Sequence, residues 1–408
     1  MRILHTSDWH LGQHFFGQTR QAEHQAFVNW LLSVVVEKEV DVVLVAGDVF
    51  DTGTPPSYAR ELYHYCLAEL SKLNIQCVVL GGNHDSVAML NESSGILARL
   101  NITVVPGLMT DPMEHVIPLH NRQGEQQAWL CALPYLRPRD LVVSQAGQTQ
   151  QQKQAQLLDA IQQHYHSIKL LADQQAKSFP IIGTGHLTTL GASVSESVRD
   201  LYIGLLDAFP ADAFPDFDYL ALGHIHRAQR VAGSEVMRYC GSPIPLSFDE
   251  AQQQKKVLLV DIEMDLEGVK SVAVIEQDVP EFRHLISLKT SLAELPKQLE
   301  AIAKKATEQW PAWLEIRVDS DAYLTDLQPR IEALTADLPI EVLRIRREHQ
   351  ASQQGLVQVE EQQLQELSVE EVFSRRLQLE ELEDSQREAL ILLHKQLLES
   401  LVVESDEL

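Results

Sequence analysis

The sequence predicts an α/β protein that carries an additional small α+β domain and a helical segment near its C-terminal end. Two observations support this fold class. Five short apolar runs, each bounded by Gly or other turn residues, are typical of buried strands, and helical stretches separate them. After residue 279 the pattern changes to short strands alternating with helices. The five runs fall in residues 3–10, 42–48, 78–85, 181–186 and 219–226.

Each of the five runs ends at residues of the types that bind metal ions. Strands of an open α/β sheet present such residues to the crevice outside their carboxyl ends, so we expect the side chains to gather at one rim. The candidate ligands are Asp8, His10, Asp48, Asn83, His186, His224 and His226. This set is large enough to hold two metal ions.

The residue types suit two divalent cations that clamp the oxygens of an in-line phosphoryl displacement. One carboxylate must lie between the ions to offset their repulsion, and Asp48, alone at its strand end, is the natural bridge. Asp8 and His10 flank one residue, so both point to the same side of an extended chain. His224 and His226 have the same spacing. Nitrogen and oxygen ligands without Cys indicate Mn²⁺, Fe²⁺ or Zn²⁺.

Each motif alone also has a structural explanation. An Asp-x-His pair is common by chance, and two histidines at a strand end can cap a sheet. Gly-Asn-His-Asp at residues 82–85 can form a plain turn. The occurrence of all five motifs, each after an apolar run, argues against purely structural roles.

The order Asp-x-His, Gly-Asp-x-x-Asp, Gly-Asn-His-Asp, Gly-His and Gly-His-x-His resembles that of the calcineurin-like metallophosphoesterases. Residues 6–12, 47–55, 221–227 and 239–248 are similar to the SbcD family of bacterial nuclease subunits. The resemblance covers nearly the whole chain and implies a metallophosphoesterase β-sandwich flanked by helices. It also implies a Mn²⁺-dependent DNA exonuclease and endonuclease, acting on duplex ends and hairpins in DNA repair. The implied partner is an SMC-like ATPase, SbcC, in a heterotetramer that contains an SbcD homodimer.

By position, the resemblance assigns one metal ion to Asp8, His10, Asp48 and His226, and the other to Asp48, Asn83, His186 and His224. It implies that His84 is not a ligand but faces the scissile phosphate, and that Asp51 orients its ring. A carboxylate beside an imidazole raises its pKa and favours the cationic form that donates a proton. Every position of the family pattern is filled.

Residues 1–278 form the predicted nuclease domain. Helices are expected at 57–73 and 87–100, directly after the second and third motifs, and the implied homodimer is expected to form through them. A Gln-rich helix at 148–163 is expected to be a solvated surface helix. Arg137 and Arg139 are candidates either for a phosphate contact or for ordinary surface charge.

Residues 279–348 form the predicted small α+β domain, which the resemblance identifies as a capping domain beside the nuclease site. The expected elements are strands at 285–288, 313–318 and 341–345 and helices at 292–307 and 327–334, with Pro329 in a first turn. Arg344, Arg346 and Arg347 form a basic cluster. A DNA contact and a solvated strand end both fit this cluster, and we favour the solvated strand end.

Residues 349–408 are predicted to be a polar linker followed by two partner-binding helices. Ser368 and Ser385, each with Glu three residues on, are typical of capping boxes. The helices carry apolar stripes at Val369, Val372, Phe373 and Leu377, and at Leu390, Leu393, Leu397 and Leu401. Two short helices cannot bury these stripes alone, so they either pack on the body or bind a partner. The linker favours a partner, and the resemblance names the base of the coiled coil of the ATPase.

The net charge of −25 is unusual for a protein that acts on DNA. Residues 351–408 contain four Lys/Arg against fourteen Asp/Glu, so part of the excess is local. A basic partner would then supply much of the phosphate contact. Without a signal peptide or a long apolar run, the chain is expected to be cytoplasmic and nucleoid-associated, with no membrane contact. Its four scattered cysteines are expected to be reduced and buried.

The residues leave two other functions open. A phosphomonoesterase or phosphoprotein phosphatase would share the five motifs, although the regions after residue 279 argue against it. A scaffold that keeps the fold without metal ions is the second alternative, and the complete ligand set argues against that one.

Overall fold

The computed structural model describes residues 1–142, 147–195, 197–198, 208–264, 270–319, 327–348 and Leu393. By its contacts the chain divides into two units, Met1–Glu348 and His349–Leu408. The two helices predicted for the second unit lie outside the described residues, apart from Leu393, which is helical. The division into domains at 278 and 348 remains a prediction.

The first unit is built around two six-stranded sheets. In spatial order, one sheet contains β14 (Lys270–Asp278), β13 (Lys256–Met264), β1 (Arg2–Thr6), β4 (Val42–Ala46), β5 (Gln76–Leu80) and β6 (Ile102–Val105). The other contains β11 (Gln229–Arg230), β12 (Met237–Tyr239), β10 (Tyr219–Gly223), β9 (Ile181–His186), β8 (Gln126–Cys131) and β7 (Val116–His120). A short hairpin, β2 (His14–Phe15) with β3 (Gln18–Thr19), follows β1.

The two sheets form a sandwich, because side chains from both contribute to one buried cluster. Ile3, Val42 and Val78 of the first sheet lie in the same apolar core as Ile182 and Tyr219 of the second. All five strands predicted from the apolar runs are present. They do not share one open sheet, however: β1, β4 and β5 lie in the first sheet, and β9 and β10 in the second. The site therefore lies where the carboxyl ends of two sheets meet.

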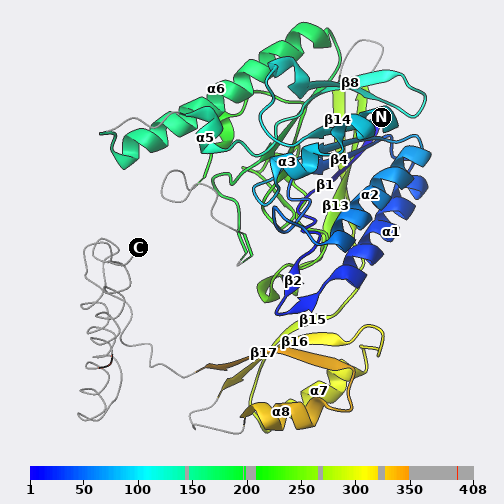
Figure 1. Cartoon of the computed structure of the whole chain (residues 1–408), viewed down its shortest axis with the longest axis vertical. Helices are drawn as coiled ribbons and strands as arrows, with labels where there is room; N and C mark the ends of the chain where they lie inside the picture. The colour runs from blue at the N-terminus through cyan, green and yellow to red at the C-terminus, as the bar shows by residue number, and fades with distance from the viewer. Residues whose placement is uncertain are drawn as a thin grey trace. The chain divides into compact units, whose positions relative to one another are not determined.

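Helices cover the outer face of each sheet (Figure 1). On the first sheet, α1 (Gln21–Glu37) and α2 (Ser57–Lys72) lie side by side and bury Phe27, Leu31 and Tyr63 against Val43 and Val45. The helix predicted at 57–73 is thus confirmed. The helix predicted at 87–100 is instead broken into α3 (Val87–Asn91), α4 (Ser94–Leu97) and a 3₁₀ turn (Ala98–Leu100). Asn, Ser and Gly between residues 91 and 95 compete poorly for helix formation and explain the break.

On the second sheet, α6 (Gln150–Ala176) is longer than the helix predicted at 148–163. It begins with a capping box in which Thr149 accepts from the Gln152 backbone N–H, and a short helix, α5 (Pro138–Leu141), precedes it. Leu157, Ile161 and Tyr165 form a buried stripe at helical spacing. The predicted solvated surface helix therefore has one buried face.

A third sheet contains only parallel strands, in the order β15 (Leu285–Thr290), β16 (Ala312–Asp319) and β17 (Ile340–Glu348). The crossovers are α7 (Leu295–Ala303) and α8 (Leu327–Thr335), which cover one face of the sheet (Figure 1). All five elements predicted for this region are present. Parallel order follows from the helices between the strands, since a parallel pair needs a crossover connection.

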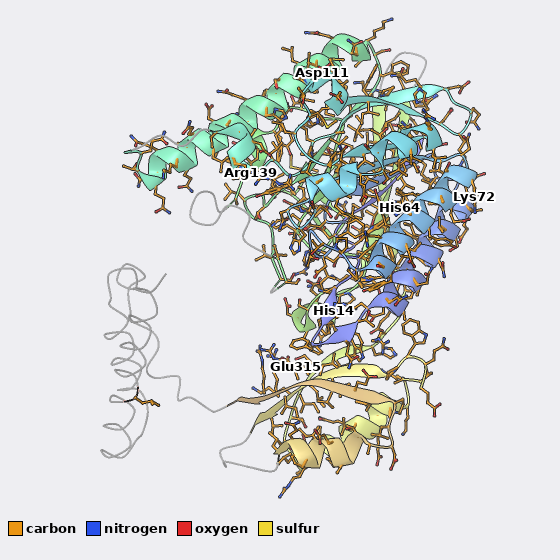
Figure 2. All side chains as sticks on the ribbon, in the orientation of Figure 1. His14, His64, Lys72, Asp111, Arg139 and Glu315 are labelled. Carbon is orange, nitrogen blue, oxygen red and sulfur yellow. The ribbon has the colours of Figure 1, made fainter. Side chains whose placement is uncertain are left out.

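The face of the small sheet away from α7 and α8 carries Glu315 (Figure 2). The buried carboxylate of Glu315 forms ion pairs with Arg344 at 3.4 Å and Arg346 at 3.3 Å. These two arginines are therefore not simply a solvated strand end. The side chain of Arg347 lies outside the described residues.

The four cysteines are free and buried, as predicted. Across the described ranges, no helix has both the length and the apolar character needed to cross a membrane.

Candidate metal centre

The predicted ligands come together at the carboxyl ends of β1, β4, β5, β9 and β10. Three groups of side chains have potential ligand atoms within 4.8 Å of one another: Asp8 with His10 and His226, His10 with Asp48 and His84, and Asp48 with His186 and His224. Asn83 joins the last group, because its Oδ1 lies 3.0 Å from Nε2 of His186. All seven predicted ligands thus meet at one place.

The loops that carry the ligands adopt left-handed backbone conformations. Asp8, His10, Asp48 and His224 have φ angles of 54°, 46°, 49° and 94°. The expectation that Asp8 and His10 share one side of an extended chain is therefore wrong, and tight turns bring them together instead. Hydrogen bonds between the loops hold these turns: Asp8 N–H donates to Gly47 O at 3.0 Å, and His10 N–H donates to Asp48 O at 3.1 Å. Such conformations are costly and concentrate at functional sites.

Asp48 lies between the two halves of the cluster. Its Oδ2 atom is 3.7 Å from Nε2 of His10 and 3.2 Å from Nε2 of His186. Its Oδ1 atom accepts a hydrogen bond from the backbone N–H of His84 at 2.9 Å, which fixes the carboxylate. Gly82 packs directly on this oxygen: a Cβ at Gly82 would lie 2.1 Å from it. The geometry is that of a carboxylate shared by two groups of ligands.

Several of the converging atoms have no hydrogen-bond partner. Within the described part of the chain, these are His10 Nε2, Asp48 Oδ2, and both ring nitrogens of His224, all of them buried. Buried polar atoms are almost always paired, so atoms of this kind aimed at one point fit bound cations. Imidazole and carboxylate donors without thiolate suit Mn²⁺, Fe²⁺ or Zn²⁺.

The electrostatics of the cluster also favour bound cations. Burial would raise the pKa of Asp48, yet His186 and His10 hold that pKa well below its usual range. Burial would lower the pKa of His186, but Asp48 raises it to about 9. Burial and the nearby His186 hold the pKa of His224 well below its usual range. The cluster thus favours an ionised Asp48, which suits a bound cation because metal ligands must be deprotonated.

Comparisons with known proteins identify the family. The protein-family model of the calcineurin-like phosphoesterases matches residues 1–228. The family model of the type 5 capsule protein repressor C-terminal domain matches residues 281–381. The SbcD subunit of the nuclease SbcCD from Escherichia coli strain K12 is 52% identical over 396 residues, which cover 96% of each chain. The chain belongs to the SbcD nuclease family of calcineurin-like phosphoesterases. The SbcD subunit from Rhodobacter capsulatus is 33% identical over 83% of this chain and 85% of its own.

As a member of this family, the chain is a metal-dependent hydrolase of phosphoric esters. The two predicted catalytic residues, His84 and Asp51, lie beside the predicted metal ligands. His84 is more accessible than the six Asp and His ligands, and its Nδ1–H donates to the backbone carbonyl of Asp51 at 2.7 Å. The carboxylate of Asp51 lies 3.1 Å from Nδ1 of His10. Asp51 therefore contacts His84 through its main chain and His10 through its side chain, a dual contact that the sequence did not indicate.

The structure also shows supporting residues that sequence reasoning missed. The buried carboxylate of Asp85 accepts from the backbone N–H groups of Val49, Phe50 and Gly82 at 3.1, 2.9 and 2.8 Å. It therefore ties the loop after β4 to the loop after β5. Asp85 is part of the predicted motif Gly-Asn-His-Asp, but the motif does not indicate which groups its carboxylate binds. The hydroxyl of Ser7 donates a hydrogen bond to the carboxylate of Asp8 and so supports this predicted ligand.

The two arginines considered for a phosphate contact differ in the structure. The guanidinium of Arg137 donates to the backbone carbonyl of Asp85 at 3.0 Å and lies over the ring of Tyr135. Arg139 is exposed and lies 3.6 Å from Asp140 (Figure 2). Arg137 thus supports the loop that carries His84, whereas Arg139 lies on the surface, and a phosphate contact by either arginine stays a prediction.

Proposed function

We propose that this SbcD-family chain hydrolyses phosphodiester bonds of DNA ends and hairpins with two divalent cations, which we take to be Mn²⁺. The observation that carries the proposal is the position of Asp48 Oδ2 between His10 and His186, among buried nitrogens that lack hydrogen-bond partners in the described structure. A carboxylate shared between two groups of ligands is what a two-metal phosphoesterase requires.

The ligand sets follow from the groups of converging atoms. One cation would be held by Asp8, His10, Asp48 and His226, and the other by Asp48, Asn83, His186 and His224. When bound, two such cations activate the attacking water and offset the charge that develops on the phosphate oxygens. The residues of the chain hold this geometry, because the left-handed turns and the Asp85 carboxylate fix the loops that carry the ligands.

His84 would act on the leaving oxygen rather than on a metal ion. The backbone carbonyl of Asp51 accepts a hydrogen bond from Nδ1–H of His84. This contact directs the other ring nitrogen, Nε2, away from the loop that carries Asp51. In its cationic form, His84 can donate the Nε2 proton to the departing oxygen. Its greater exposure than the ligands supports a role that faces the substrate.

The proposed partner is the SMC-like ATPase SbcC, since the relatives are named as subunits of a nuclease SbcCD. Residues 349–408 would bind it, and the complex would work in the bacterial cytoplasm at the nucleoid. The domains would be a nuclease domain at 1–278, a capping domain at 279–348 and the partner-binding segment. A homodimer would form through α2 and the helical segment after β5, where Tyr65 and Ile96 are exposed apolar residues.

A nuclease assay with the full-length chain and Mn²⁺ tests the proposal. We expect cleavage of linear duplex and hairpin DNA, with protein-blocked ends processed only when the ATPase and ATP are added. A nitrophenyl phosphomonoester serves as the competing substrate. Turnover of that monoester without any cleavage of DNA would instead identify a phosphomonoesterase.

A further inference from the structure

A buried ion pair lies next to His226, and the mechanism described above does not use it. Glu250 ends a 3₁₀ turn (Phe248–Glu250) and is fully buried. Its Oε2 atom lies 2.6 Å from the ammonium group of Lys255, which is also buried. Removing two charges from water is costly unless their partners are well placed. The contacts of this pair therefore indicate what it stabilises.

One carboxylate oxygen of Glu250 is directed at the imidazole of His226. Glu250 Oε1 lies 3.2 Å from His226 Nδ1. Ser197 contacts both groups: its Oγ is 2.6 Å from the same Nδ1 and donates to Glu250 Oε1. Ser195 donates to this oxygen as well, at 2.6 Å. Since Nδ1 is occupied by these partners, Nε2 is the nitrogen left to meet Asp8 and His10.

The other half of the ion pair holds the backbone of the same histidine. Lys255 Nζ donates to the carbonyl oxygen of His226 at 2.9 Å and to Ser242 Oγ at 3.0 Å. The remaining oxygen of Glu250 accepts from the backbone N–H of Leu246 at 3.0 Å. The ring and the main chain of His226 are therefore both fixed by one Glu250–Lys255 pair.

We propose that Glu250 and Lys255 are positioning residues for His226, which hold its ring in the tautomer and orientation needed to bind a divalent cation through Nε2. This inference rests on the proposed role of His226 as a ligand. A carboxylate behind a ligating imidazole fixes its tautomer and raises its basicity, and loss of such a partner typically costs about 10–100-fold in metal affinity. His186 differs, because among the described residues the hydrogen-bond partner of its Nδ1 is a backbone carbonyl, that of Ala46, at 2.9 Å.

The competing explanation is that the pair merely stabilises the turn at residues 242–255. A double-mutant cycle separates the two explanations, because residues that act through one another have non-additive effects. The Mn²⁺ affinity of the full-length chain is measured by titration calorimetry for wild type, Glu250→Gln, His226→Ala and the double variant. We expect Glu250→Gln to weaken binding about 10–100-fold in the wild-type background. In the His226→Ala background, it should have little further effect.

Glu315→Gln is the matched control. Glu315 is equally buried and forms ion pairs with arginine side chains, but it lies in the small sheet. It should leave the Mn²⁺ affinity unchanged. Ser197→Ala is the second variant, for use if Glu250→Gln does not fold: it removes the hydroxyl beside Nδ1 and leaves the ion pair intact. We expect a loss near 10-fold, again absent in the His226→Ala background.

Three outcomes are distinguishable. Equal losses in both backgrounds overturn the inference and favour a structural pair. If the wild type binds two Mn²⁺ ions and both Glu250→Gln and Ser197→Ala bind them equally well, the inference is overturned. The proposed function then still stands. Wild type that binds no Mn²⁺ overturns the proposed function itself, and with it the role of His226.

Discussion

The Oδ2 atom of Asp48 lies 3.2 Å from Nε2 of His186, yet within the described residues neither this oxygen nor the nearby Nε2 of His10 forms a hydrogen bond. The three residues lie at or just beyond the carboxyl ends of different strands, β4, β9 and β1, which belong to two sheets. Their convergence on one buried point is the relationship from which the proposed chemistry follows.

The shared carboxylate is the first point to test. Asp48→Ala should abolish nuclease turnover and release at least one metal ion, because one side chain serves both groups of ligands. Metal content by mass spectrometry and cleavage of linear duplex DNA measure the two effects. Asp111→Ala, on the surface (Figure 2), is the control and should behave as wild type. Two retained ions with normal activity in Asp48→Ala would show the site assignment to be wrong.

His84 allows chemistry to be separated from metal binding. His84→Ala should keep both ions and bind DNA, but lose roughly 10²–10⁴-fold in cleavage rate, the usual contribution of an acid–base group. His186→Ala is the comparison, because it removes a proposed ligand and should lose metal. Loss of metal from His84→Ala to the same extent as from His186→Ala would contradict the proposed role, and would favour His84 as a ligand in the group with His10 and Asp48.

Gly82 tests how tightly the bridging carboxylate is held. A Cβ at this position would meet Asp48 Oδ1 at 2.1 Å and Asp48 N at 2.3 Å, so Gly82→Ala must displace the loop after β4. We expect a loss of stability of about 1–3 kcal/mol, as for other overpacked sites, and weaker metal binding. Thermal melting with and without Mn²⁺ measures both. Gly95→Ala is the control, because a Cβ there has no atom within 4 Å, and it should bind metal normally.

The role of residues 349–408 is tested by removing them. Deletion of residues 351–408 should leave a folded, metal-loaded phosphodiesterase, because Met1–Glu348 forms a compact unit by itself. It should hydrolyse a small phosphodiester at the normal rate but no longer bind the ATPase, which co-purification measures. A large fall in melting temperature on truncation, with ATPase binding unchanged, would mean that this segment docks on its own nuclease body instead.

The sequence by itself determined the strands and the residues that are candidate metal ligands. Both are local properties: an apolar run bounded by turn residues specifies a buried strand, and the residue that follows it is brought to the strand end. Asp48 and His186 could therefore be chosen as candidate ligands without knowledge of their neighbours. The elements of the small sheet were predictable for the same reason, since their apolar periodicities are short and distinct.

Only the tertiary structure decided how these parts meet. The division of the five strands between two sheets depends on which faces pack together, and no local pattern records this. The left-handed turns at Asp8 and His10 exist because the backbone N–H groups of both residues donate hydrogen bonds to the loop after β4. The partnership of Glu250 with His226 joins residues 24 positions apart through a fold that buries both. A buried carboxylate shows its role only through the groups around it, and folding is what places those groups.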